Sequence, residues 1–161
     1  MKIKRLFIIL FSIIFIVGLI LFISCPYLFY TYGLNRINEL PKPLNIKIDK
    51  SVRQKIWLDY QGEGSPKMVK VSPYDSMYSI ICLNQASIVQ DMKKCYNKYP
   101  GFRHAQIFAV YYLRESEKHS KQLLWEFSAF ALSIWLTKNW SIDDILNGLY
   151  FYQENYYKKY H

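Results

Sequence analysis

The chain has 161 residues, of which 52% are hydrophobic and 18% aromatic, and it carries a formal net charge of +9. This apolar content argues against a disordered chain, because disordered proteins contain few hydrophobic and aromatic residues. The basic residues are scattered rather than gathered in a run, so nucleic acid is the least favoured partner. The length fits one domain once an N-terminal segment is set aside.

Residues 1–30 are predicted to form a membrane anchor. The stretch Leu6–Ile23 is almost entirely apolar, and an apolar helix of that length spans a bilayer core of about 30 Å. Lys2, Lys4 and Arg5 precede it, and the positive-inside rule then keeps the N-terminus in the cytoplasm. The expected location is a bacterial inner membrane, crossed once, with the C-terminal domain in the periplasm.

A cleaved signal sequence is the main alternative to a permanent anchor. The charged start and apolar centre fit a signal peptide. The residues Phe22-Ile23-Ser24-Cys25 also resemble a bacterial lipoprotein cleavage box, in which Cys25 would be the acylated residue. The alternative for Cys25 is a buried cysteine at the end of a spanning helix. Either form of anchoring leaves the domain outside the cytoplasm and tethered to the membrane.

Residues 31–66 are predicted to form a linker with irregular or short strand structure. Pro41 and Pro43 favour extended backbone. The segment Ile46–Leu58 alternates weakly between polar and apolar residues and fits either a short strand or a helix. Residues 61–66 contain two glycines and a proline and are expected to form a turn.

Residues 67–161 are predicted to form a helical domain that begins with a well-marked helix. Ser72 is a suitable N-cap, Pro73 suits the first helical position and Asp75 lies in the first turn. Apolar residues continue from this start towards Met92, which predicts one helical region extending that far.

Cys82 and Cys95 are candidates for a disulfide in an oxidising compartment. If both lie on one continuous helix, about 20 Å separates them, which is too far for a disulfide. Their pairing therefore stays open. The cysteines, His104 and His119 lack the short spacing of metal ligands, so neither a metal site nor another cofactor is expected.

Two further helical regions complete the domain. Gln106–Leu113 is apolar and expected to be helical. Leu123–Tyr152 is expected to contain the central core helix, which ends at Asn139, followed by a second helix. Ser141 and Asp144, three residues apart, fit a capping box for that second helix, so the segment predicts a two-helix corner.

An anchor, a linker and three helical patches follow one another in an order that resembles bacterial peptidoglycan glycosyltransferases of the monofunctional transglycosylase type. The patches are Val71–Asn84, Gly101–Leu113 and Leu123–Leu149. They are similar in placement to the helix leading into the family's Glu-Asp motif, to its Gly-x-Ser-Thr-Ile-x-Gln-Gln segment and to its last two motif helices. The resemblance implies a mainly α, lysozyme-like domain.

The residues that carry the family's chemistry are mostly replaced in this chain. Leu83-Asn84 stand where the Glu-Asp pair is expected, and Gln106 is the plausible survivor of the second motif. At the other motif positions stand Trp125 and Glu126 for Arg-Lys, Ala129 for glutamate, Ile142 for lysine and Asn147 for glutamate. The family's last third has no counterpart here. The resemblance therefore implies a degenerate, truncated relative that has lost its general base and pyrophosphate-binding groups.

Four residues are candidates for a functional site. Glu126 is the candidate catalytic acid, because burial in an apolar helix would raise its pKa towards a useful range. Arg103, His104 and Gln106 are candidates for binding an anionic sugar-phosphate. The alternatives are a carboxylate on a solvated helix stripe for Glu126 and ordinary surface solvation for the other three.

Three functional hypotheses follow from these residues. The first is an anchored cell-envelope protein that binds or modulates cell-wall synthesis proteins or the lipid-linked peptidoglycan precursor without polymerising glycan. The second is a divergent peptidoglycan glycosyltransferase that uses Glu126 on lipid-linked disaccharide. The third is an envelope lipoprotein or immunity-type protein with a structural role.

Overall fold

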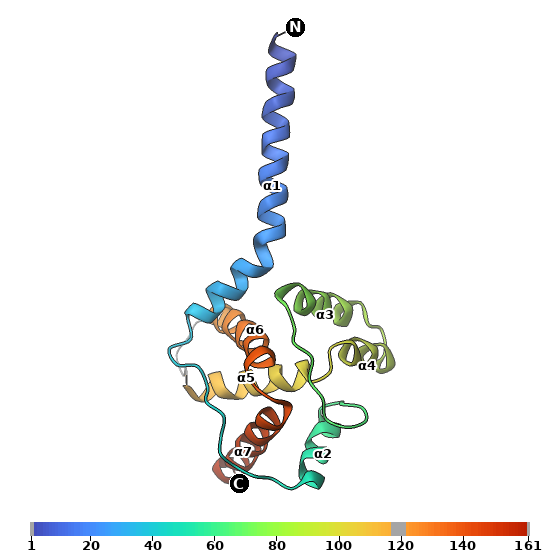
Figure 1. Cartoon of the computed structure of the whole chain (residues 1–161), viewed down its shortest axis with the longest axis vertical. Coiled ribbons are helices and arrows are strands. Elements are labelled where there is room, and N and C mark those ends of the chain that lie inside the picture. The colour runs from blue at the N-terminus through green and yellow to red at the C-terminus, as the bar shows by residue number, and fades with distance from the viewer. Residues whose placement is uncertain (1, 117–121, 161) are drawn as a thin grey trace.

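The computed structural model describes residues 2–116 and 122–160, and side chains from 10 to 116 and from 125 to 155. Every secondary-structure element in these described residues is a helix and none is a strand, which confirms the predicted mainly α class. Figure 1 shows one long helix standing above a body formed by the other helices. The helices are α1 (Lys2–Asn35), α2 (Lys50–Asp59), α3 (Pro73–Gln85), α4 (Val89–Lys98), α5 (Phe102–Ser116), α6 (Gln122–Asn139) and α7 (Ile142–Tyr160).

The helix α1 is long and apolar enough to cross a membrane once. Within Leu10–Asn35, an 18-residue window has a mean hydropathy of 2.5. Apolar side chains along the upper part are exposed, as expected for a segment whose solvent is lipid. Pro26 lies inside α1, and the helix bends where it reaches the body (Figure 1). A proline removes one helical hydrogen bond and its ring clashes with the preceding turn, so Pro26 accounts for the bend.

The lower part of α1 packs on α6, the central helix of the body. Gly33 makes the close approach possible, because its missing side chain leaves room for the Phe127 backbone. The Ser128 hydroxyl donates to the Gly33 carbonyl at 3.2 Å. On its other side α6 packs against α5 through a core that includes Leu132 and Leu136. The predicted central core helix is therefore confirmed.

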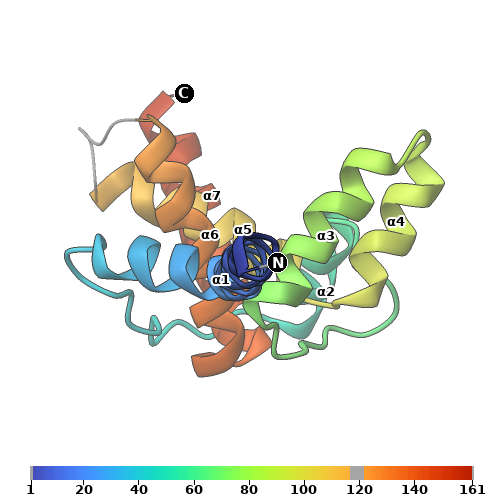
Figure 2. The same cartoon turned by 90° about the horizontal axis from the view of Figure 1, so that it is seen from above.

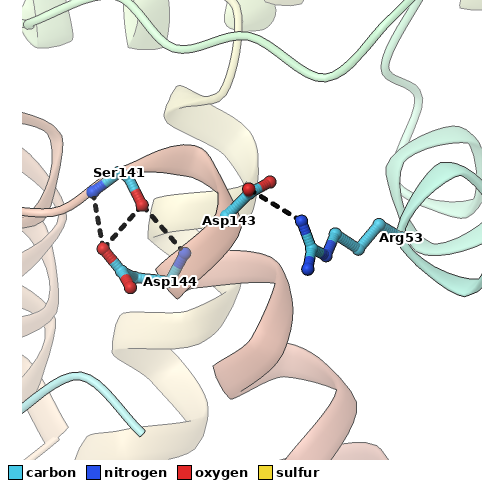
Figure 3. A network of polar contacts seen from close by, with 4 residues as sticks. All are labelled: Arg53, Ser141, Asp143 and Asp144. Carbon is cyan, nitrogen blue, oxygen red and sulfur yellow. Dashed lines mark hydrogen bonds and ion pairs between the residues drawn. The ribbon is translucent and has the colours of Figure 1, made fainter. Parts of the chain in front are cut away.

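Figure 3 shows the corner between α6 and α7, which also matches the prediction. The Ser141 hydroxyl accepts from the Asp144 backbone N–H at 3.2 Å, and the Asp144 carboxylate accepts from the Ser141 backbone N–H at 3.0 Å. These reciprocal bonds satisfy two donors that the helix start would leave unpaired. The Arg53 Nη1 atom on α2 lies 2.7 Å from Oδ2 of Asp143, the residue before Asp144, and this ion pair connects α2 to α7.

Replacing Ser141 with alanine is expected to lower the free energy of unfolding by about 1 kcal/mol, because an N-cap hydroxyl is lost. Ser65→Ala is the control, since Ser65 is exposed in the turn after α2. Urea unfolding of the full chain in detergent micelles, followed by tryptophan fluorescence, measures both. Equal stability of the two variants would contradict the capping role.

The segment between α1 and α3 packs against the body for much of its length. Ile46 and Ile48 contact the core, and α2 follows, so the ambiguous Ile46–Leu58 stretch forms a helix from Lys50 onward. The turn predicted after α2 is present, with Gln61 and Gly64 in the left-handed region at φ 68° and 64°.

The region from Ser72 to Lys98 departs from the sequence prediction. Ser72 caps the helix as expected, and Asp75 adds the second bond of a capping box, but the helix ends at Gln85 instead of continuing to Met92. Ala86 and Ile88 adopt extended backbone, and α4 returns alongside α3. The two helices form an antiparallel hairpin, visible from above in Figure 2.

This hairpin brings the two candidate cysteines together. Cys82 on α3 and Cys95 on α4 form a disulfide with a Cα–Cα distance of 5.8 Å. The two cysteines do not share one continuous helix, because the chain reverses between them, so the separation of about 20 Å does not apply and the open question of their pairing is answered.

Candidate functional site

An apolar cavity lies where α1, α3 and α6 meet. Its volume is about 290 Å³. The lining residues are Pro26 and Phe29 from α1, Met77 and Ile80 from α3, and Glu126, Phe127 and Phe130 from α6. The Phe29 and Phe127 rings stack at 5.0 Å between centroids, which joins two of the three walls. We define these seven residues as the junction pocket.

Glu126 is the charged residue of the junction pocket. Glu126 is exposed, and the other lining residues are apolar, so the carboxylate lies at the edge of an apolar surface. General acid–base catalysis also needs a means of stabilising the charge that develops on the reacting group. The pocket lining supplies no cation for that purpose. The arrangement suits a ligand with a long apolar part and a polar group at the rim.

Arg103 and His104 lie on α5, which does not line the junction pocket. The Arg103 guanidinium donates to the Tyr96 hydroxyl and lies 4.3 Å from the centre of that ring. This contact holds α5 against α4. Gln106 is half-buried on the same helix. The three candidate phosphate-binding residues are therefore separate from Glu126, and no described hydrogen bond joins them to it.

His104 is buried rather than directed to solvent. Its ring stacks on Trp57 at 4.3 Å, with the Tyr60 ring edge-on at 6.0 Å. The Nε2–H donates to the Trp57 carbonyl at 3.1 Å, while the buried Nδ1 has no partner. Burial lowers the pKa of His104 to about 4, which the hydrogen bond to Trp57 only partly offsets and the charge of Arg103 reinforces. At neutral pH His104 is therefore an uncharged part of the core.

The other residues of interest from the sequence lie apart from the pocket. Cys25 is a free, half-buried cysteine inside α1, directly before Pro26. Asn147 is buried on α7, and its Oδ1 has no hydrogen-bond partner. Within residues 2–116 and 122–160, no three His, Cys, Asp or Glu side chains are gathered as metal ligands.

Sequence reasoning singled out Glu126, whose exposed side chain fits the solvated-stripe alternative and not burial, and it missed the residues around it. Phe29 falls within the predicted anchor, and Met77 and Ile80 fall within the helix predicted to begin at Ser72, so the sequence alone does not place them beside Glu126. The close approach of α1 to α6 at Gly33 brings these segments together. A glycine directly after an apolar span is the signal that could have indicated this approach.

Comparisons with protein-family models, curated proteins and solved structures found no match to the chain. Function is therefore inferred from the geometry of the molecule.

Proposed function

We propose that the chain is a single-pass membrane protein whose helical domain works outside the cytoplasm as a binding or modulating component of the bacterial cell envelope. The observation that carries this proposal is the direct continuation of the apolar helix α1 into a domain held by a disulfide. The anchor and the body share one helix, so the domain works at the membrane surface.

Two independent features support the extracytoplasmic side. The basic residues Lys2, Lys4 and Arg5 precede the apolar stretch, which favours a cytoplasmic N-terminus. The Cys82–Cys95 disulfide lies in the domain on the other side of that stretch, and structural disulfides persist in oxidising compartments.

A binding role is favoured over catalysis because the described residues that line the pocket with Glu126 are all apolar and offer it no second polar or charged side chain. Arg103, Gln106 and the buried His104 lie on α5, away from the pocket walls. An apolar pocket with a carboxylate rim beside a membrane helix suits a lipid-linked molecule. The resemblance to peptidoglycan glycosyltransferases makes a lipid-linked peptidoglycan precursor, or a protein that uses one, the expected target.

Protease treatment of intact spheroplasts tests the topology. Digestion of the domain, with a cytoplasmic marker protein left intact, is the expected result. Alkylation before and after reduction should show that Cys82 and Cys95 react only after reduction. A protected domain with both thiols free would overturn the proposal.

A divergent glycosyltransferase remains a second candidate, because Glu126 lies at the pocket that would hold the lipid-linked substrate. The purified full chain in nanodiscs, given lipid-linked disaccharide, separates the two functions. Binding of the disaccharide without formation of polymer favours the binding or modulating function. Polymer that disappears in Glu126→Gln favours the enzyme, and Glu154→Gln is the control at an exposed glutamate on α7.

A further inference from the structure

The helix α3 has its polar and apolar sides reversed relative to a water-exposed helix. Ser76 and Ser79 are buried against the body. Tyr74, Tyr78 and Ile81 are exposed, and their spacing of four and three residues places them along one edge of the helix. A helix that faces water normally shows the opposite pattern. The exposed edge of α3 therefore has a surface suited to an apolar solvent.

The start of α3 contacts α1 at the end of its apolar stretch. The Tyr74 hydroxyl donates to the Ile23 carbonyl, and the Tyr74 ring meets Tyr27 edge-on at 5.5 Å. Eighteen helical residues ending at Ile23 extend about 27 Å, close to the thickness of a bilayer core. Ile23 therefore lies near the boundary between hydrocarbon and head groups, and Tyr74 lies at the same level.

The direction of α3 keeps it near that level. In Figure 1, α3 lies beside the bend of α1, above α4 and α2. In Figure 2, viewed along the upper part of α1, the α3–α4 hairpin extends sideways from the anchor. An anchor that crosses the bilayer along this axis places α3 roughly in the plane of the membrane surface.

One lysine lies against the exposed edge of α3, and a second lies against the lower part of α1. The Lys98 ammonium lies 3.6 Å from the centre of the Tyr78 ring, and the Lys138 ammonium lies 5.1 Å from that of Tyr30. Tyrosines collect at membrane interfaces, and lysines near the surface attract anionic lipid head groups. The positive charge of Lys98 beside Tyr78 therefore complements an anionic bilayer.

We propose that α3 is an interfacial helix, with the edge formed by Tyr74, Tyr78 and Ile81 resting in the anionic phospholipid bilayer that holds α1. The chain then has two membrane contacts, the span and a helix lying on the surface. The junction pocket, between α3 and α1, opens beside this contact, because its lining residues Phe29 and Ile80 are both exposed.

Photo-crosslinking of the full chain tests this contact. A benzophenone amino acid is placed at Ile81 in one sample and at Leu58 on α2 in another, because the two side chains are 52% and 53% exposed. Both proteins are reconstituted in nanodiscs of phosphatidylglycerol and phosphatidylethanolamine. Mass spectrometry measures phospholipid adducts, and alkylation confirms that the Cys82–Cys95 disulfide has formed.

Several-fold more phospholipid adduct at position 81 than at position 58 is the expected result. Equal adduct at the two positions, or none at position 81, overturns the proposal. Crosslinking of position 81 to a second copy of the chain instead of to lipid also overturns it, and identifies the α3 edge as a surface for self-association.

Discussion

Replacing Gly33 with valine is expected to lower the free energy of unfolding by about 3 kcal/mol, at the upper end of the usual cost of overpacking. A Cβ at this position would lie 2.8 Å from the Phe127 carbonyl carbon and 2.9 Å from Ala131 Cβ, and nearer still to the Phe127 carbonyl oxygen. Backbone atoms of a central helix cannot move aside without disturbing the core. The lower part of α1 would therefore separate from α6.

Gly18→Val is the matched control, because a Cβ at Gly18 meets no atom within 4 Å. Urea unfolding in detergent micelles measures the stability of both variants. The ring stacking of Phe29 on Phe127 should also be lost in Gly33→Val, and limited proteolysis should then cut near the bend of α1. Unchanged stability of Gly33→Val would show that the packing of α1 on α6 contributes little.

Acidification is expected to destabilise the domain through His104. The pKa of His104 falls from 6.5 to about 4 on folding, so the unfolded chain takes up the proton first. The stability that depends on the neutral ring is complete above about pH 7 and decreases as the pH falls towards 4. The expected loss between about pH 7.5 and about pH 4.5 is roughly 2–3 kcal/mol, since each pKa unit corresponds to about 1.4 kcal/mol.

His104→Phe isolates this effect, because phenylalanine keeps a ring against Trp57 and cannot take up a proton. Its stability at neutral pH should be lower, since the hydrogen bond to the Trp57 carbonyl is lost. Between about pH 7.5 and about pH 4.5, the free energy of unfolding of His104→Phe should fall by roughly 2–3 kcal/mol less than that of the parent chain. If the free energies of unfolding of the two proteins changed with pH in parallel, a neutral, buried His104 would be contradicted.

The elements that could be predicted from sequence are those fixed by local chemistry. Ser72 was expected as an N-cap and Ser141 with Asp144 as a capping box, and the structure shows a helix beginning at each serine with a carboxylate three residues later. The apolar Leu6–Ile23 stretch likewise predicts a long apolar helix from its own length and composition. These features depend on neighbours in the chain and need no knowledge of tertiary contacts.

The features that escaped prediction depend on contacts between distant segments. The reversal between Cys82 and Cys95 follows Ala86 and Ile88, which carry no strong turn signal. His104 was taken for a surface residue because its burial is created by Trp57, 47 residues earlier. Glu126 was identified by its apolar surroundings, but its exposure depends on where α1 and α3 lie.

The single helix that carries both the anchor and part of the core limits how far the domain can travel. A protein tethered by a flexible linker can move well away from the membrane, whereas in the proposed topology this body would stay within its own height of the lipid. Rotation of the anchor about its axis would turn the whole body with it. In the proposed topology, a partner would therefore meet the domain at the membrane, or be another membrane protein that diffuses in the same plane.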